Sequence, residues 1–173
     1  MKDHGDPLTD GDLVRIDFVG FLANIRARME HITVSPEEPL GLEDIAELEV
    51  WGQLITAGFT SPIVGHMATS AREIIAQGWP RFFDWEISLD RADPLVAIPP
   101  HPDHDFSQLR TAKQLLDDEF NRRDSRATAL TAGLEPRQAC SLFESLLLTY
   151  NWLILWLTEP DTDLSTTPPK FLD

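Results

Sequence analysis

The densest group of side chains that could do chemistry is His101-Pro102-Asp103-His104-Asp105. Two imidazoles and two carboxylates within five residues are ligands of the kinds that zinc sites use. The intervening proline stiffens the chain, however, and no His-rich or Cys-rich stretch follows, so a solvated linker is the favoured interpretation. A metal-handling protein that uses His101 and His104 stays the third of three functional hypotheses, and no residue is assigned as a metal ligand.

A second polar group is the acidic stretch that contains Glu43, Asp44, Glu47 and Glu49. Two carboxylates can act as general acid and base, but nothing here sets a second group against a substrate bond, which favours a solvated face. The sequence has no Gly-rich phosphate loop, no paired Cys motif and no Ser-His-Asp pattern. No standard polar catalytic motif is therefore expected.

The apolar residues predict the elements of the first half of the chain. Residues 13–20 and 82–90 alternate apolar with polar side chains, which is typical of half-buried antiparallel strands. Thr60, Ser61 and Pro62 form a start signal for a helix, since Ser and Thr cap helices and Pro is tolerated in the first turn. Residues 41–50 fit either a short helix or a strand.

Three segments, residues 13–20, 54–67 and 83–89, resemble in this order the FKBP-type prolyl isomerases, most closely the trigger-factor type of isomerase domain. The resemblance implies an α+β fold for residues 9–92, with an antiparallel curved sheet and one short helix. It implies a strand at residues 71–76 and a helix that ends soon after Pro62, because Gly65 follows.

The resemblance also implies a type of catalysis that needs no polar motif. Rotation about a prolyl amide faces a barrier of roughly 20 kcal/mol, because amide resonance must be broken. An apolar cup that removes water from the amide carbonyl lowers this barrier without a nucleophile, metal or cofactor. The family pattern assigns this catalytic cup to Phe18, Leu54, Ile55, Phe59 and Phe83, and the alternative for these residues is an ordinary core.

Other parts of the family pattern are only partly present. Met29 and Glu30 are the nearest counterparts of a Phe-Asp pair in the family, and Trp79 lies where the long hairpin of the family is shortened. These three residues are assigned to substrate binding. Leu54 and Phe59 are also one residue further apart than the family spacing.

Beyond residue 104 the apolar period changes to three and four, which is typical of amphipathic helices. One helix is expected from Asp105 to Arg123 and a second from Pro136 to Glu159. The second half of the later helix is apolar almost all round and must bury itself against the rest of the chain, a second copy or another protein. The residues assigned to partner binding are Leu148, Trp152, Leu155 and Trp156, with a helix-bundle core as the alternative.

Composition limits the classes of partner. The chain of 173 residues carries a net charge of −15, which argues against nucleic acid and anionic membranes and favours a protein or peptide partner. The longest apolar run, 145–158, is shorter than the roughly 20 residues that span a bilayer. Cys140 is the only cysteine, so no internal disulfide is expected. The N-terminal residues show no secretion signal, and a cytoplasmic location is expected.

The sequence thus predicts an FKBP-like domain at residues 9–92, a Pro-rich linker at 93–104, a two-helix extension at 105–160 and a mobile tail at 161–173. The leading hypothesis is a prolyl isomerase or chaperone-like domain that binds proline-containing or unfolded polypeptides. The alternative is a catalytically silent accessory protein that docks one dedicated partner through its C-terminal helix. Residues 142–157 would form that contact, or the contact of a homo-oligomer.

Overall fold

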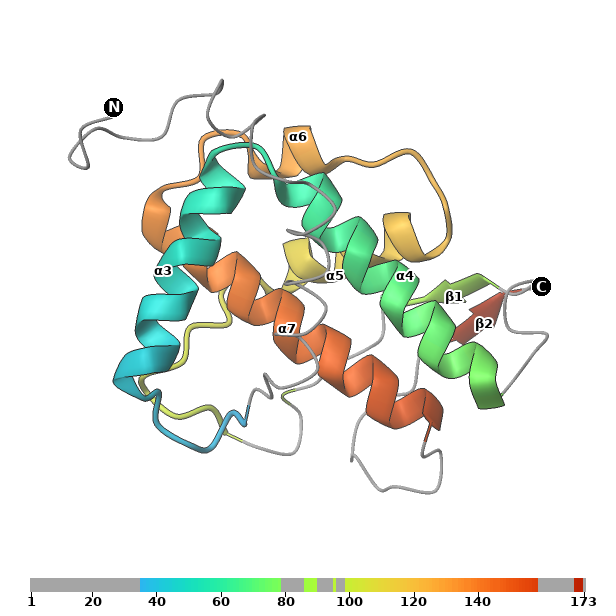
Figure 1. The fold of residues 1–173 in the computed structure, drawn as a ribbon, viewed down its shortest axis with the longest axis horizontal. Helices are drawn as coiled ribbons and strands as arrows, with labels where there is room; N and C mark the ends of the chain where they lie inside the picture. Colours follow the sequence, from blue (N-terminus) through green and yellow to red (C-terminus); the bar gives the residue numbers. More distant parts are fainter. Residues whose placement is uncertain (1–34, 79–85, 90–94, 96–98, 159–169, 173) are drawn as a thin grey trace, which may run out of the picture.

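The computed structural model describes residues 35–78, 86–89, 95, 99–158 and 170–172, and the statements below concern these residues. The helices are α3 (Leu42–Thr56), α4 (Thr60–Gly78), α5 (Leu109–Phe120), α6 (Ala127–Thr131) and α7 (Pro136–Thr158), and the strands are β1 (Glu86–Ser88) and β2 (Lys170–Leu172). Helix α7 crosses the centre of the molecule, with α3 lying across its first half and α4 running beside it (Figure 1). The described part of the chain is thus a helical assembly built around α7.

The α+β fold expected from the FKBP resemblance is wrong. Within the described residues the sole pairing of strands is between β1 and β2, which run antiparallel with Ile87 opposite Phe171. Two strands of three residues each cannot form a curved sheet that encloses a cup. Residues 71–76, expected as a strand, lie inside α4.

Helix α4 continues through Gly65, where the sequence predicted a stop. A glycine inside a helix costs only about 1 kcal/mol relative to alanine, which tertiary packing can offset. A Cβ on Gly65 would lie 3.4 Å from Oε2 of Glu119, an ordinary van der Waals contact, so the packing of α4 on α5 does not require a glycine here. The buried side chains of Ala68 and Ala71 continue the packed face of α4, so burial favours one long helix over a helix followed by a strand.

Residues 41–50, which fitted either a helix or a strand, belong to α3. The amide of Gly41 donates to Oδ2 of Asp44 at 3.1 Å, which satisfies one of the free donors at the start of the helix. After α3 ends, Gly58 adopts a φ of +96°, a left-handed conformation that glycine enters without strain. This turn leads directly into α4.

The two helices predicted for the C-terminal half are confirmed. Helix α7 begins at Pro136, where a proline lacks only an amide hydrogen that the first turn leaves unbonded anyway. Helix α5 begins at Leu109, four residues later than predicted, and ends at Phe120. The short helix α6 was not predicted.

Both halves of the chain contribute to one hydrophobic core. Leu142, Phe143 and Leu146 of α7 are fully buried. The indole of Trp51 on α3 stacks on the ring of Phe143, with ring centroids 4.5 Å apart and planes 8° from parallel. Phe120 of α5 is fully buried in the same core. The position of α3 against the first half of α7 therefore depends on residues about 90 positions apart in the sequence.

Candidate functional site

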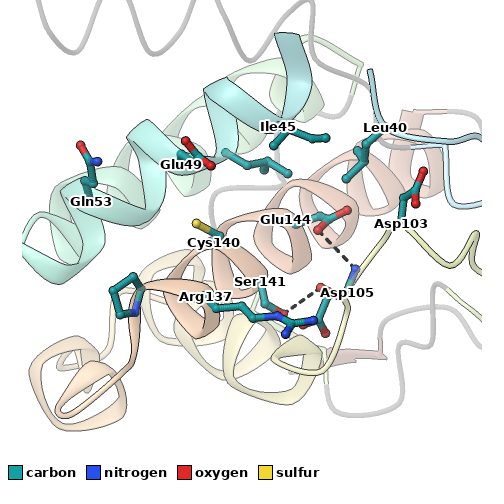
Figure 2. Close-up of a pocket in the computed structure, with 12 residues that line it drawn as sticks. Leu40, Ile45, Glu49, Gln53, Asp103, Asp105, Arg137, Cys140, Ser141 and Glu144 are labelled. Atoms are coloured by element: carbon teal, nitrogen blue, oxygen red, sulfur yellow. Dashed lines mark hydrogen bonds between the residues drawn. The ribbon is translucent and has the colours of Figure 1, made fainter. Parts of the chain in front are cut away.

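A groove of about 650 Å³ lies between α3 and the first half of α7. Its lining residues are Leu40, Ile45, Leu48, Glu49, Gln53, Asp103, Asp105, Pro136, Arg137, Cys140, Ser141 and Glu144. Figure 2 shows side chains of α3 along one wall and side chains of α7 along the other, with Asp103 and Asp105 at one end. We call this hollow the α3–α7 groove.

One end of the groove is held by a buried pair of His104 and Glu144, whose side chains are 4% and 5% exposed. Nδ1 of His104 contacts Oε1 of Glu144, and Nε2 lies 2.6 Å from the carbonyl oxygen of Glu38. Because a carbonyl oxygen only accepts hydrogen bonds, Nε2 is the donor in the bond to Glu38. Both imidazole nitrogens are therefore engaged, and neither faces a metal site.

The electrostatics of Glu144 follow from its burial. Burial raises the pKa of this carboxyl, while hydrogen bonds from His104 and from the amide of Asp105 counteract part of the shift. The amide of Asp105 donates to Oε2 of Glu144 at 3.4 Å (Figure 2). The carboxylate thus ties the segment around residue 104 to α7, a structural role that uses both of its oxygens.

Asp105 supplies a stable negative charge at the same end of the groove. Burial acts to raise the pKa of this carboxyl, but hydrogen bonds from Ser107 and Ser141 and the charge of Arg137 outweigh it, so the pKa lies below its usual value. The amide of Ser107 donates to Oδ1 of Asp105 at 3.0 Å. The hydroxyl of Ser141 donates to the backbone carbonyl of Asp105 at 2.8 Å. Asp105 is therefore ionised at neutral pH.

Cys140 lines the groove but is not an activated nucleophile. Burial raises the pKa of its thiol, and the negative charges of Glu49 and Glu144 raise it further. Since the thiolate is the reactive form, a raised pKa keeps this sulfur unreactive at neutral pH. The groove therefore offers shape, apolar surface and charge, but no nucleophile with a base beside it.

The predicted cup is not assembled by its described members. Ile55 is 2% exposed and belongs to the core between the helices, where Leu54 and Phe59 are partly buried against it. None of the three lines the α3–α7 groove. The other predicted cup and substrate residues lie outside the described part of the chain: Phe18, Phe83, Met29, Glu30 and Trp79.

Two of the predicted partner-binding residues, Leu148 and Trp152, are buried, each with 5% of its surface exposed. Their burial fits the alternative interpretation from the sequence, a helix-bundle core. A partner could contact these two side chains only after they become exposed. Nothing is described for the side chains of Leu155 and Trp156. A partner contact by these four residues stays a prediction.

Sequence reasoning missed the apolar residues of α3. Leu42, Ile45 and Val50 are 88%, 42% and 50% exposed, and they alternate with the acidic residues that suggested a solvated face. The available signal was the presence of large apolar side chains within that acidic stretch. Ile45 lines the groove and Leu42 lies three residues before it on the same side of α3, whereas Val50 lies about 140° around the helix from Ile45.

A second, smaller hollow of about 430 Å³ is polar and lies where α4 meets the end of α5. Arg72, Arg122 and Arg123 line it together with Glu73 and Glu119. Nε of Arg72 donates to the carbonyl oxygen of Phe120 at 2.7 Å, and the guanidinium lies 4.6 Å from the centre of the Phe120 ring. Cations at a helix C-terminus offset the negative end of its dipole, so this cluster stabilises the end of α5.

The fold and the site define a helical protein with an apolar, acid-edged surface groove. No known protein family, curated protein or solved structure matches the chain. The identification as an FKBP-type isomerase is wrong, because helices occupy the described positions where that family has sheet. Among the described residues no helix is long and apolar enough to cross a bilayer, and no cluster of three or more His, Cys, Asp or Glu side chains is arranged around a metal position.

Proposed function

We propose that this chain is a catalytically silent accessory protein that docks one dedicated protein partner in the α3–α7 groove. The observation that carries the proposal is Ile45, a large apolar side chain that lines this groove and is 42% exposed, with the more exposed Leu42 three residues earlier on α3. Covering a side chain of this size contributes roughly 1.5–3 kcal/mol. An apolar surface that continues into a groove is the usual mark of a protein-binding site.

The proposal keeps the docking role considered from the sequence but assigns it to a different part of α7. The first half of this helix, with Arg137, Cys140 and Glu144, forms one wall of the groove. In the second half, Leu148, Trp152 and Leu153 are buried. Docking at the first half leaves the core intact, whereas docking at these three residues would disturb it.

A prolyl isomerase is not proposed, because its support came from the FKBP cup and the helical fold removes that support. A chaperone remains distinguishable from an accessory protein by its partners, since a chaperone binds many clients weakly. We also propose a cytoplasmic location, since a chain with one cysteine has no internal disulfide that would call for an oxidising compartment.

A photoreactive amino acid placed at Gln53 would test the proposal in cells that make the protein. Gln53 is exposed and lines the groove. We expect one protein to be cross-linked in stoichiometric amount, and we expect Ile45→Asp to abolish the product by placing a charge in the contact. The matched control is the same amino acid at Thr56, which is exposed on α3 but does not line the groove.

Three results would reject the accessory role: no cross-linked protein, many proteins in small amounts, or one partner that Ile45→Asp leaves unchanged. Circular dichroism of Ile45→Asp would verify that the helices persist. Ile45 is sufficiently exposed for this substitution to leave the core in place.

A further inference from the structure

We infer that the occupant of the α3–α7 groove is a basic amphipathic helix supplied by the partner, an inference that rests on the proposed function. The backbone of the groove, its apolar lining and its charge each restrict the occupant. The three restrictions are independent of one another. Together they select one kind of segment.

The first restriction is that the walls of the groove cannot extend a sheet. Both walls are helices, α3 and α7, whose backbone groups are bonded within the helices themselves. An extended peptide laid against them would bury amide and carbonyl groups without partners, which is costly. A helical occupant satisfies its own backbone and presents only side chains, as in other helix-in-groove complexes.

The second restriction is the position of the apolar residues. Leu40, Ile45 and Leu48 line the groove, and Leu42 adds exposed surface on α3 outside the lining set. An occupying helix meets such a strip with apolar residues spaced three and four apart. The volume of about 650 Å³ has room for several large side chains of this kind.

The third restriction is charge. Glu49 lines the groove on the α3 side, and Asp103 and Asp105 line its end. Arg137 offsets one of these charges through its interaction with Asp105. The excess is negative, so Lys and Arg on the flanks of the occupant complement it.

Charge also distinguishes a partner from a second copy of this chain. Glu49, Asp103 and Asp105 make the lining of the groove acidic. Two copies with a net charge of −15 each would bring these acidic linings together, which like-charge repulsion disfavours. The occupant is therefore a segment of a different protein.

Three pools of synthetic 18-residue peptides would test this inference on the full chain by fluorescence anisotropy. All pools carry Leu at the same helix-spaced positions and differ only in the flanking residues, which are Lys, Gln or Glu. We expect the Lys pool to bind about tenfold more tightly than the Gln pool at low salt, and the difference to shrink in 0.5 M NaCl. A fourth pool, the Lys pool with a central Pro, should lose binding because Pro breaks the helix.

Matched variants separate binding in the groove from attraction to an acidic protein in general. Glu49→Gln removes one charge at the groove, and Asp124→Asn removes one exposed charge outside it. We expect Glu49→Gln to weaken the Lys pool two- to fivefold, as for one exposed ion pair, and Asp124→Asn to have no effect. Ile45→Ser should weaken all pools that bind.

Several results would overturn the inference. One is a Gln or Glu pool that binds as tightly as the Lys pool, and another is a Pro pool that keeps its affinity. Equal losses from Glu49→Gln and Asp124→Asn would show non-specific attraction, and a concentration-dependent dimer abolished by Ile45→Ser would show a second copy as the occupant. The accessory role would survive these results if Gln53 still cross-linked one partner through a neutral or acidic segment, or through a segment that is not helical.

Discussion

At the scale of single residues, the pair of His104 and Glu144 shows how a polar motif becomes structural. In the sequence, His104 and His101 were candidates for metal binding. In the structure the His104 ring is buried, and its two nitrogens contact Glu144 and the carbonyl oxygen of Glu38. Glu144 lies 40 residues further along the chain, so no local pattern revealed this pairing. A buried ion pair is weak evidence of stability by itself, but removal of one partner is costly.

We therefore predict that His104→Ala lowers the free energy of unfolding by about 3 kcal/mol at pH 7. The substitution leaves the Glu144 carboxyl buried and without its imidazole partner. Because burial raises the pKa of Glu144, the folded state binds a proton more tightly than the unfolded state does. The loss should therefore be greatest above the raised pKa and should decrease as the pH falls through it toward the unfolded value, since the neutral carboxyl is cheaper to bury.

Urea denaturation at pH 7 and pH 5 would measure this difference. His101→Ala is the control, because its side chain is 32% exposed and bonds only locally, to the amide of Asp103, and we expect a loss of about 1 kcal/mol or less at both pH values. An equal loss for His104→Ala at the two pH values would contradict the assignment of the penalty to ionised Glu144.

At the scale of elements, the close approach of α3 and α7 is set by Gly52. A Cβ at this position would lie 2.4 Å from Sγ of Cys140 and 3.1 Å from its backbone nitrogen. The two helices therefore touch with almost no side chain between them at this point, and the groove opens next to this contact.

Gly52→Ala should destabilise the protein by about 1–3 kcal/mol, because the added methyl group forces α3 and α7 apart. Gly65→Ala is the matched control: its Cβ would lie 3.4 Å from the flexible carboxylate of Glu119, and alanine favours the helix by up to about 1 kcal/mol. Thermal and urea unfolding of both variants would measure the contrast.

Cys140→Ala should restore only part of the stability that Gly52→Ala loses, because the backbone contact remains when the sulfur is removed. A double-mutant cycle would measure this coupling. If Gly52→Ala proved as stable as Gly65→Ala, the close contact of α3 with α7 would be wrong, and the geometry of the groove would be wrong with it.

At the scale of the whole molecule, the net charge of −15 dominates the long-range electrostatics. Buried carboxylates near the end of α5 are paired, as in the two bonds of 2.8 Å and 2.9 Å from Arg126 to Asp118. The overall excess of negative charge nevertheless repels itself in the compact state. The same excess would attract a basic partner.

We predict that raising NaCl from 10 mM to 300 mM at pH 7 increases the free energy of unfolding by on the order of 1 kcal/mol, because salt screens this repulsion. The control is the same titration near pH 4.5, the isoelectric point of the sequence, where the net charge is close to zero and the effect should be small. Salt that destabilised the protein at pH 7, or that acted equally at both pH values, would show that self-repulsion is not the dominant contribution.

What the sequence determined by itself was local: where the C-terminal helices lie, which residues are charged, and the absence of an internal disulfide. A proline at the start of a helix and an apolar period of three and four are local signals, because each depends only on residues a few positions apart. Pro136 and residues 109–120 show these signals, and α7 and α5 were predicted from them. Residues 71–76 carry no such local signal, since short apolar runs fit a strand or a buried helix equally well. The resemblance to FKBP domains then favoured the wrong choice.

Only the tertiary structure decided that α4 is one helix and that a groove exists. Gly65 becomes part of a helix because Ala68 and Ala71, which follow it on α4, are buried in the core, and Gly52 places α3 directly on α7. The walls of the groove, Ile45 on one side and Cys140 on the other, come from segments about 90 residues apart. The period of apolar residues predicts single helices but not which distant helices contact each other, because burial and close contact between helices are properties of the packed chain.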